Sequence, residues 1–61
     1  MLVLARKKNE RVLLRLGDVV VTVTLVEIRG DKARIGFTAP EAVAIHREEV
    51  YEQIYGKEVK P

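Results

Sequence analysis

The segment AVAIHREEVY, residues 42–51, holds the only histidine of the chain, His46, and places Glu49 three residues after it. On a helix this spacing would put both side chains on one face, where they could bind a metal ion or share a proton. A catalytic metal site normally needs three protein ligands, and the chain has no cysteine and no second histidine. We therefore expect no metal and no cofactor here, and a junction role for His46 between a strand and a helix.

Covalent catalysis has little support in the composition. The chain has no serine and no cysteine, and its threonines fall in a predicted strand or turn without a triad candidate nearby. The glycines at positions 17, 30, 36 and 56 form neither a phosphate-binding loop nor a dinucleotide motif. The sequence thus predicts a protein that is not an enzyme.

The charges are unevenly distributed along the chain, although the net charge is only +2. The first quarter is basic and contains one acid, Glu10, whereas the segment from Glu41 to Glu52 is acidic around Arg47. This asymmetry favours an anionic partner such as RNA, whose phosphates would meet the basic segment. Aromatic residues are not interleaved with the basic ones, which argues against recognition of RNA by stacking. The basic residues are Arg6, Lys7, Lys8, Arg11 and Arg15.

Alternating apolar and polar residues predict five short strands within about residues 1–45. Gly-Asp pairs at 17–18 and 30–31 predict turns between the middle three. The strands are expected at LVLARK, RVLLRL, VVVTVTLVEI, ARIGF and VAI. In the third strand one face is expected to carry Val19, Val21, Val23 and Leu25, and the other Val20, Thr22, Thr24, Val26 and Ile28.

After VAI the hydrophobic period changes from two to about four residues, which predicts an amphipathic helix over about 47–55. Gly56 is placed to end it, and residues 56–61 are expected to form a tail. The fold class is therefore all-β with a short C-terminal helix, in a single domain of residues 1–55. The residues that recur four apart are Val50 with Ile54, and Tyr51 with Tyr55.

A chain of 61 residues without cysteine has few ways to become stable. Its third strand is largely apolar on both faces, so both faces need cover. We expect a two-fold homodimer; the alternative is a monomer with a small, well-packed core. No signal peptide is recognisable and no apolar run is long enough to cross a bilayer, so we expect a soluble cytoplasmic protein without a membrane partner.

The order of motifs resembles the carbon storage regulator (CsrA/RsmA) family of bacterial post-transcriptional regulators. The matching stretches are MLVLARK, GD followed by VTV, ARIGFTAP and VAIHREEVY, and the resemblance runs from Met1 to about Tyr55. It implies an intertwined homodimer of five-stranded chains, in which strands 1 and 5 are exchanged so that the first strand of one subunit lies beside the fifth of the other.

The resemblance also implies a function. The chain would be a sequence-specific RNA-binding regulator of translation that binds GGA motifs in mRNA leaders near the ribosome-binding site and usually represses translation. Regulatory small RNAs with GGA motifs would antagonise it, as in some bacteria would a flagellar assembly protein; DNA binding is not expected. The alternative is a dimeric protein-interaction regulator that does not bind RNA.

The residues that the resemblance assigns to RNA binding lie in two segments. Arg47 would be the main cationic contact, and main-chain groups around residues 38–45 would read the guanines. Ala5 stands where the family often has Thr or Ser, and Lys7 replaces a frequent arginine and its planar fork. The stretch from RVLLRL to RGDK is a few residues longer than the family norm. The first-strand half comprises Leu4, Arg6 and Lys7, and the other half comprises Thr38, Val43, Ala44, Ile45, His46 and Arg47.

Overall fold

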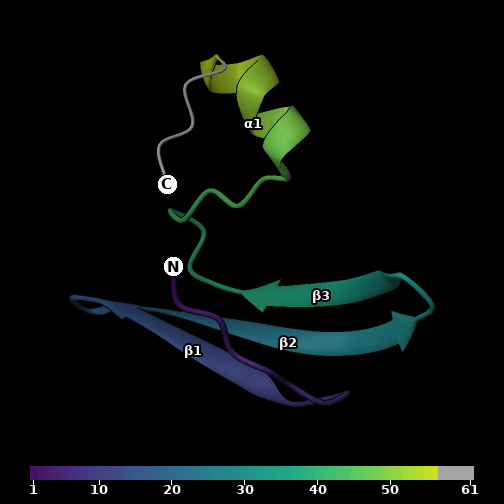
Figure 1. Cartoon of the computed structure of the whole chain (residues 1–61). Helices are drawn as coiled ribbons and strands as arrows, with labels where there is room; N and C mark the ends of the chain where they lie inside the picture. Colours follow the sequence, from purple (N-terminus) through teal and green to yellow (C-terminus); the bar gives the residue numbers. More distant parts are fainter. Residues whose placement is uncertain (57–61) are drawn as a thin grey trace.

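The computed structural model describes residues 1–56, in which three antiparallel strands are followed by one helix (Figure 1). The strands lie side by side in chain order, and the helix follows the last of them. The chain is thus mostly β with a short C-terminal helix, as the sequence predicts. Of the expected tail, residues 57–61 lie outside the described residues. The elements are β1 (Arg11–Leu16), β2 (Val19–Arg29), β3 (Lys32–Thr38) and α1 (Glu48–Tyr55).

Two-residue turns join the three strands, at the positions where the sequence predicts them. Leu16 pairs with Val19 across the first turn, and Arg29 pairs with Lys32 across the second. Gly17 and Gly30 have φ values of 61° and 60°, a left-handed conformation that glycine adopts without a steric penalty. The hairpin geometry is therefore encoded locally.

A β-bulge at Val26 changes which side chains share a face of the sheet. Leu25 pairs with Ile35, but the next paired residue of β2 is Glu27, which faces Arg34. The extra residue reverses the alternation, so Ile28 lies on the same face as Leu25 rather than on the opposite one. The sequence-based assignment of Ile28 is thus wrong, because strict alternation cannot anticipate an inserted residue.

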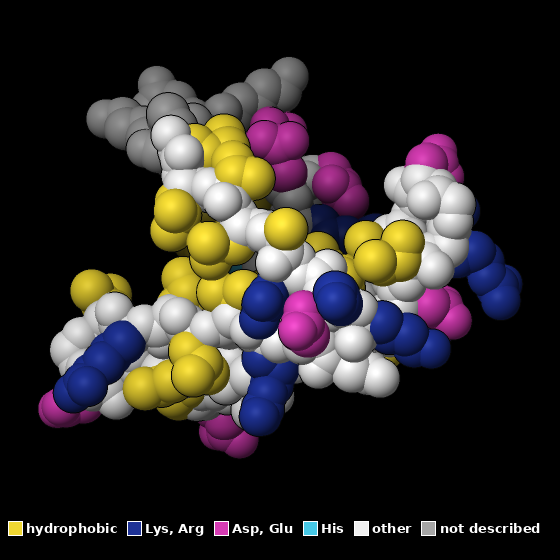
Figure 2. All heavy atoms as spheres, turned by 60° about the horizontal axis from the view of Figure 1, so that its bottom comes forward, with side chains coloured by type: hydrophobic (Ala, Val, Ile, Leu, Met, Phe, Trp, Pro, Cys, Tyr) yellow, Lys and Arg dark blue, Asp and Glu magenta, His cyan; other side chains and the backbone are white. Residues whose placement is uncertain are grey.

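The sheet has one continuous apolar face, called here the inner face. Its side chains point toward the N-terminal segment and the helix, whereas the underside of the sheet in Figure 1 is the outer face. Figure 2 shows that hydrophobic side chains are visible on the underside as well, beside several Lys and Arg. No side chain in residues 1–56 is fully buried, so the alternative of a well-packed monomeric core is not found there. The inner face carries Val12, Leu14, Leu16, Val19, Val21, Val23, Leu25, Ile28, Ala33, Ile35 and Phe37.

Two of the five predicted strands are not strands in the single chain. Residues 2–7 and 43–45 form no ladder, because a strand exists only beside a hydrogen-bonded neighbour and neither segment has one within residues 1–56. The first segment runs across the inner face of the sheet (Figure 1). It is tied down where the Asn9 N–H donates to the Leu25 carbonyl at 2.6 Å and the Leu25 N–H donates to the Glu10 carbonyl at 3.0 Å.

The C-terminal helix stands away from the sheet and does not pack against its strands (Figure 1). Glu48 and Glu49 lie in its first turn, where carboxylates complement the positive end of the helix dipole. The helix ends at Gly56, which has φ 91° and donates its N–H to the Glu52 carbonyl at 2.9 Å. Within the described part of the chain, no helix is long and apolar enough to cross a membrane.

Candidate nucleic-acid interface

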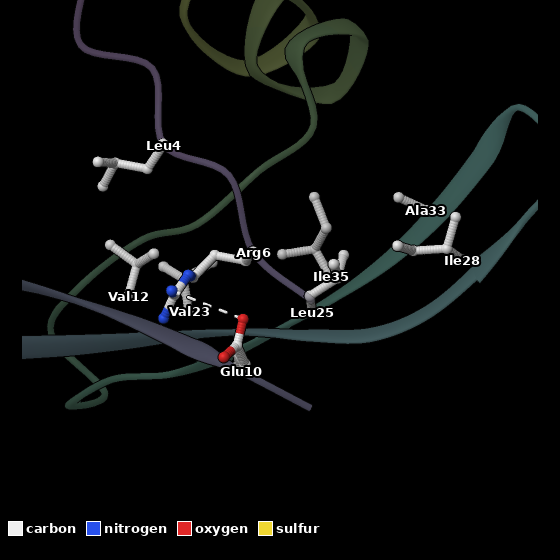
Figure 3. Close-up of a pocket in the computed structure, with 9 residues that line it drawn as sticks. All are labelled: Leu4, Arg6, Glu10, Val12, Val23, Leu25, Ile28, Ala33 and Ile35. Atoms are coloured by element: carbon white, nitrogen blue, oxygen red, sulfur yellow. Dashed lines mark ion pairs between the residues drawn. The ribbon is translucent and has the colours of Figure 1, made fainter. Parts of the chain in front are cut away.

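The first half of the expected site lies in the N-terminal segment, over one end of the inner face. Leu4 and Arg6 line an open depression of about 390 Å³ whose floor is made by apolar side chains of all three strands. In Figure 3 those side chains point up from the sheet, and Leu4 and Arg6 come from the segment that crosses above it. The depression is therefore an uncovered part of the inner face with a cation beside it.

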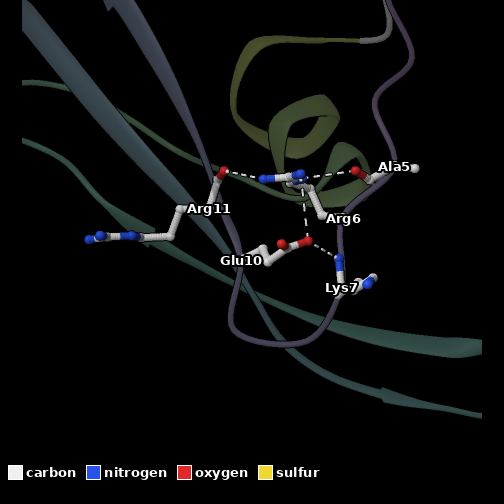
Figure 4. A network of polar contacts seen from close by, with 5 residues as sticks. All are labelled: Ala5, Arg6, Lys7, Glu10 and Arg11. Carbon is white, nitrogen blue, oxygen red and sulfur yellow. Dashed lines mark hydrogen bonds and ion pairs between the residues drawn. The ribbon is translucent and has the colours of Figure 1, made fainter.

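Arg6 is held by a small polar network around Glu10 (Figure 4). Its Nε donates to the Ala5 carbonyl at 2.8 Å and its Nη1 to the Arg11 carbonyl at 3.4 Å. Its Nη2 lies 3.6 Å from Glu10 Oε1, and the same oxygen accepts the Lys7 N–H at 2.7 Å. The Arg11 side chain points away from this network. One carboxylate thus orders the turn and orients the arginine.

Glu10 is a residue that the sequence-based assignment missed. It appeared there only as the single acid in a basic segment, yet it contacts both Arg6 and the main chain of Lys7. The signal was present as an acid four residues after an arginine at the end of a predicted turn. Because the pair is exposed and salt-screened, it orients Arg6 more than it stabilises the chain.

The second half of the expected site lies in the connection between β3 and α1. Thr38 is the last residue of β3, and a turn follows in which the Val43 N–H donates to the Pro40 carbonyl at 3.0 Å. No other hydrogen bond within residues 1–56 involves the main chain of residues 41–46, Ala44 included. Apart from the Val43 N–H, these peptide groups are free to bind a ligand, as a reading of guanine edges would require.

Ile45, His46 and Arg47 line a second depression, together with Ala33, Ile35 and Phe37 of β3. The Arg47 side chain is 80% exposed, and its Nε lies 3.4 Å from Glu49 Oε1. An exposed ion pair of this kind contributes little energy, so a phosphate can displace the carboxylate from the guanidinium. Arg47 is thus an exposed cation at the rim of an apolar depression.

The structure of the single chain does not bring the two halves of the expected site into contact with each other. Leu4 and Arg6 line one depression, Ile45 to Arg47 line another, and Ala33 and Ile35 border both. Val43 lies apart from them, in a third depression near the β1–β2 turn. The two segments therefore face the same side of the sheet within one chain without completing a site.

His46 has aromatic neighbours that the sequence did not reveal. Its ring centroid lies 6.3 Å from that of Tyr55, which lies 4.7 Å from that of Tyr51. The four-residue spacing of the two tyrosines was visible in the sequence. The sequence did not show that the connection before α1 folds so that the His46 ring lies near Tyr55. Among residues 1–56 there is no group of three or more side chains that could hold a metal ion.

Comparison with known proteins places these features in a family. Residues 1–56 match the sequence model of the CsrA global regulator protein family. Translational regulator CsrA of Rhodopirellula baltica is 54% identical over 54 residues, which cover 88% of this chain and 73% of the relative. The proteins of the same name from Treponema pallidum and Lachnospira eligens are 46% and 44% identical, and the matches cover 88% of this chain and 70% of each relative.

Proposed function

The chain belongs to the CsrA family of global regulators, and from that membership we propose that it regulates translation by binding mRNA. The family is one of regulators rather than enzymes. The observation that supports the proposal is that two exposed segments, one with Arg6 and Lys7 and one with Arg47, face the same side of the sheet. Most peptide groups of the second segment have no hydrogen-bond partner within residues 1–56. Both segments lie within the matched residues.

We propose that the working form is a homodimer whose subunits cover each other's inner faces. Fully burying a large apolar side chain contributes roughly 1.5–3 kcal/mol, and the inner face leaves many such side chains uncovered in the single chain. Residues 2–7 and 43–45 would then become the two missing strands, each paired with a segment of the other subunit. Residues 1–55 would form one RNA-binding domain in this assembly.

In this dimer the first segment of one subunit would lie beside residues 43–47 of the other. Each of the two sites would combine Leu4, Arg6 and Lys7 with Arg47, and the free peptide groups before it would read a GGA motif. The cations would bind phosphates, and the main chain would bind base edges. Two sites on one dimer raise the effective concentration of a second motif in the same transcript.

The expected targets are mRNA leaders, where a protein bound near the ribosome-binding site blocks initiation in the cytoplasm. Small RNAs with several GGA motifs would compete for the same two sites. A flagellar assembly protein would be a further antagonist. The alternative function is that of a dimeric regulator that contacts only proteins. RNA binding that weakens steeply with salt would support the first function, whereas absence of RNA binding even at low salt would support the alternative.

The test is a binding titration with two RNA hairpins that differ only in presenting GGA or CCA in the loop. We expect a clear preference for GGA and an affinity that falls steeply with salt, because several phosphates are neutralised. Equal affinities for the two hairpins would contradict the proposal. Absence of RNA binding at low salt, together with a co-purifying protein partner, would favour the alternative.

A further inference from the structure

An aromatic cluster borders the candidate RNA site, and its two tyrosines have no part in the function proposed so far. It consists of His46, in the connection before α1, and of Tyr51 and Tyr55 on the helix itself. The ring centroids of His46 and Tyr55 are 6.3 Å apart at an interplanar angle of 50°. Those of Tyr51 and Tyr55 are 4.7 Å apart at 42°. Both distances are typical of aromatic pairs in contact.

The local sequence explains why the rings meet. Tyr51 and Tyr55 are four residues apart, so they lie one above the other on the same face of α1. His46 precedes the helix by two residues, and the connection brings its ring back to the end of the helix near Tyr55. The rings remain open to solvent, with Tyr51 37% and Tyr55 59% exposed and His46 exposed as well. In the single chain the cluster is therefore accessible and already assembled.

The charges around the cluster determine what it can bind. The helix carries acids at Glu48, Glu49 and Glu52 and has no basic residue in its last turn. A phosphate would be repelled by this surface, whereas an uncharged flat ring would not. Among residues 1–56, the cation that lies next to the cluster in sequence is Arg47, directly after His46. A ligand that presents an uncharged ring to the tyrosines and an anion to Arg47 therefore suits both the acidic helix and the cation.

We propose that His46, Tyr51 and Tyr55 form a stacking platform for one unpaired RNA base next to the bound motif. A nucleotide combines a neutral aromatic base with an anionic phosphate, and stacking on aromatic side chains tolerates any base. This inference rests on the proposed function and deepens it, because it adds a contact outside GGA. It also revises the expectation that stacking has no role: one stacked base complements main-chain reading of the motif.

The experiment uses the full chain and a GGA hairpin in which one unpaired nucleotide beside the motif is either adenosine or an abasic residue, tested on each side in turn. The abasic residue removes the base and keeps the phosphates. On one of the two sides we expect the wild type to bind the adenosine RNA at least about 5-fold more tightly. Tyr55→Leu should lose this difference and bind the abasic RNA as the wild type does, whereas Tyr55→Phe should keep it.

The chain offers a second, direct measurement. It contains two tyrosines and no tryptophan, and both tyrosines belong to the cluster, so its tyrosine fluorescence reports on the platform alone. We expect the adenosine RNA to change this fluorescence more than the abasic RNA at equal saturation. A CCA hairpin supplies the control for binding away from the motif.

The outcomes separate the two proposals. If GGA and CCA hairpins bind equally, or neither binds, the proposed function fails and the platform fails with it. If GGA binding is specific but adenosine and abasic RNAs are equivalent on both sides, only the platform is overturned. If Tyr55→Leu weakens binding of both RNAs equally, the tyrosine serves the fold or the subunit contact, which also overturns the platform. The dimer mass and circular dichroism of each variant identify that last case.

Discussion

The three-stranded sheet and the two segments that flank it obey different physical constraints. In the sheet, each strand has its hydrogen-bonded neighbour and each turn has its glycine, so local sequence determines the structure. Residues 1–8 and 39–47 have few main-chain partners within the described chain, yet they carry all the proposed RNA contacts except Thr38 and the two tyrosines of α1. The difference teaches that the stable part of this chain is a scaffold, and we propose that its function lies in segments that become strands only beside a second subunit.

The largest expected effect comes from a charge on the inner face. Ile35 and Leu13 are 52% and 66% exposed in the single chain, so exposure alone does not show which of them faces a second subunit. In the proposed dimer only Ile35, on the inner face, would become buried. We expect Ile35→Lys to cost more than about 3 kcal/mol and abolish the dimer, because it buries an unpaired charge. Leu13→Lys, on the outer face, should leave dimer mass and thermal unfolding nearly unchanged; equal effects would contradict the assignment of faces.

The next largest effect should come from the candidate site itself. Arg47→Ala is expected to lower affinity for a GGA hairpin by roughly 10- to 100-fold and to reduce its salt dependence. Arg29→Ala, an exposed arginine at the β2–β3 turn, is the matched control and should change affinity little. The measurement is a titration at several salt concentrations. Similar losses in both variants would show that binding depends on net charge and not on the site.

A smaller effect tests the scaffold. A Cβ at Gly36 would lie 3.2 Å from Val26 Cγ2, because the bulge carries that methyl over the glycine. We expect Gly36→Ala to lower the free energy of unfolding by on the order of 1 kcal/mol, measured by denaturant titration. Adding Val26→Ala should remove this incremental cost of the Gly36 substitution. If the cost of Gly36→Ala is the same in both backgrounds, the close approach does not explain the glycine.

The smallest effect concerns the network around Arg6. Glu10→Gln keeps an oxygen that can accept the Lys7 N–H but removes the charge that pairs with Arg6. We expect RNA affinity to rise by about threefold at low salt, the scale of an exposed ion pair, and the gain to vanish at high salt. Weaker binding in this variant would contradict the prediction and would mean that losing the orientation of Arg6 by Glu10 costs more affinity than removing the negative charge gains. Glu41→Gln is the control for the change in net charge.

The parts that the sequence predicted are those that depend on near neighbours. The turns at Gly17 and Gly30 follow from backbone freedom, and the α1 helix follows from its period and its terminal Gly56. The bulge at Val26 was missed, so Ile28 was assigned to the wrong face. A bulge depends on how a strand pairs with its neighbour. The residue pattern of one strand alone does not contain that information.

The candidate site was less accessible to sequence reasoning. Residues 2–7 and 43–45 have strand-like patterns, but a strand requires a partner that the single chain does not supply. Glu10 and the tyrosine cluster were missed because both depend on how the chain folds back on itself. The family resemblance supplied the assignments of RNA-binding residues that spacing alone could not. The RNA titrations of the variants test these assignments.

The central claim is that each RNA site combines segments from two subunits. One chain carrying Arg6→Ala and Lys7→Ala is co-refolded with another carrying Arg47→Ala, and the mixed dimer is isolated by tags and titrated with a GGA hairpin. If each site joins Arg6 and Lys7 of one subunit with Arg47 of the other, the mixed dimer keeps one site in which all three residues are intact. We therefore predict near wild-type affinity for one RNA per dimer, although each parent dimer binds weakly. If the mixed dimer binds as weakly as its parents, both halves come from one chain and the account is contradicted.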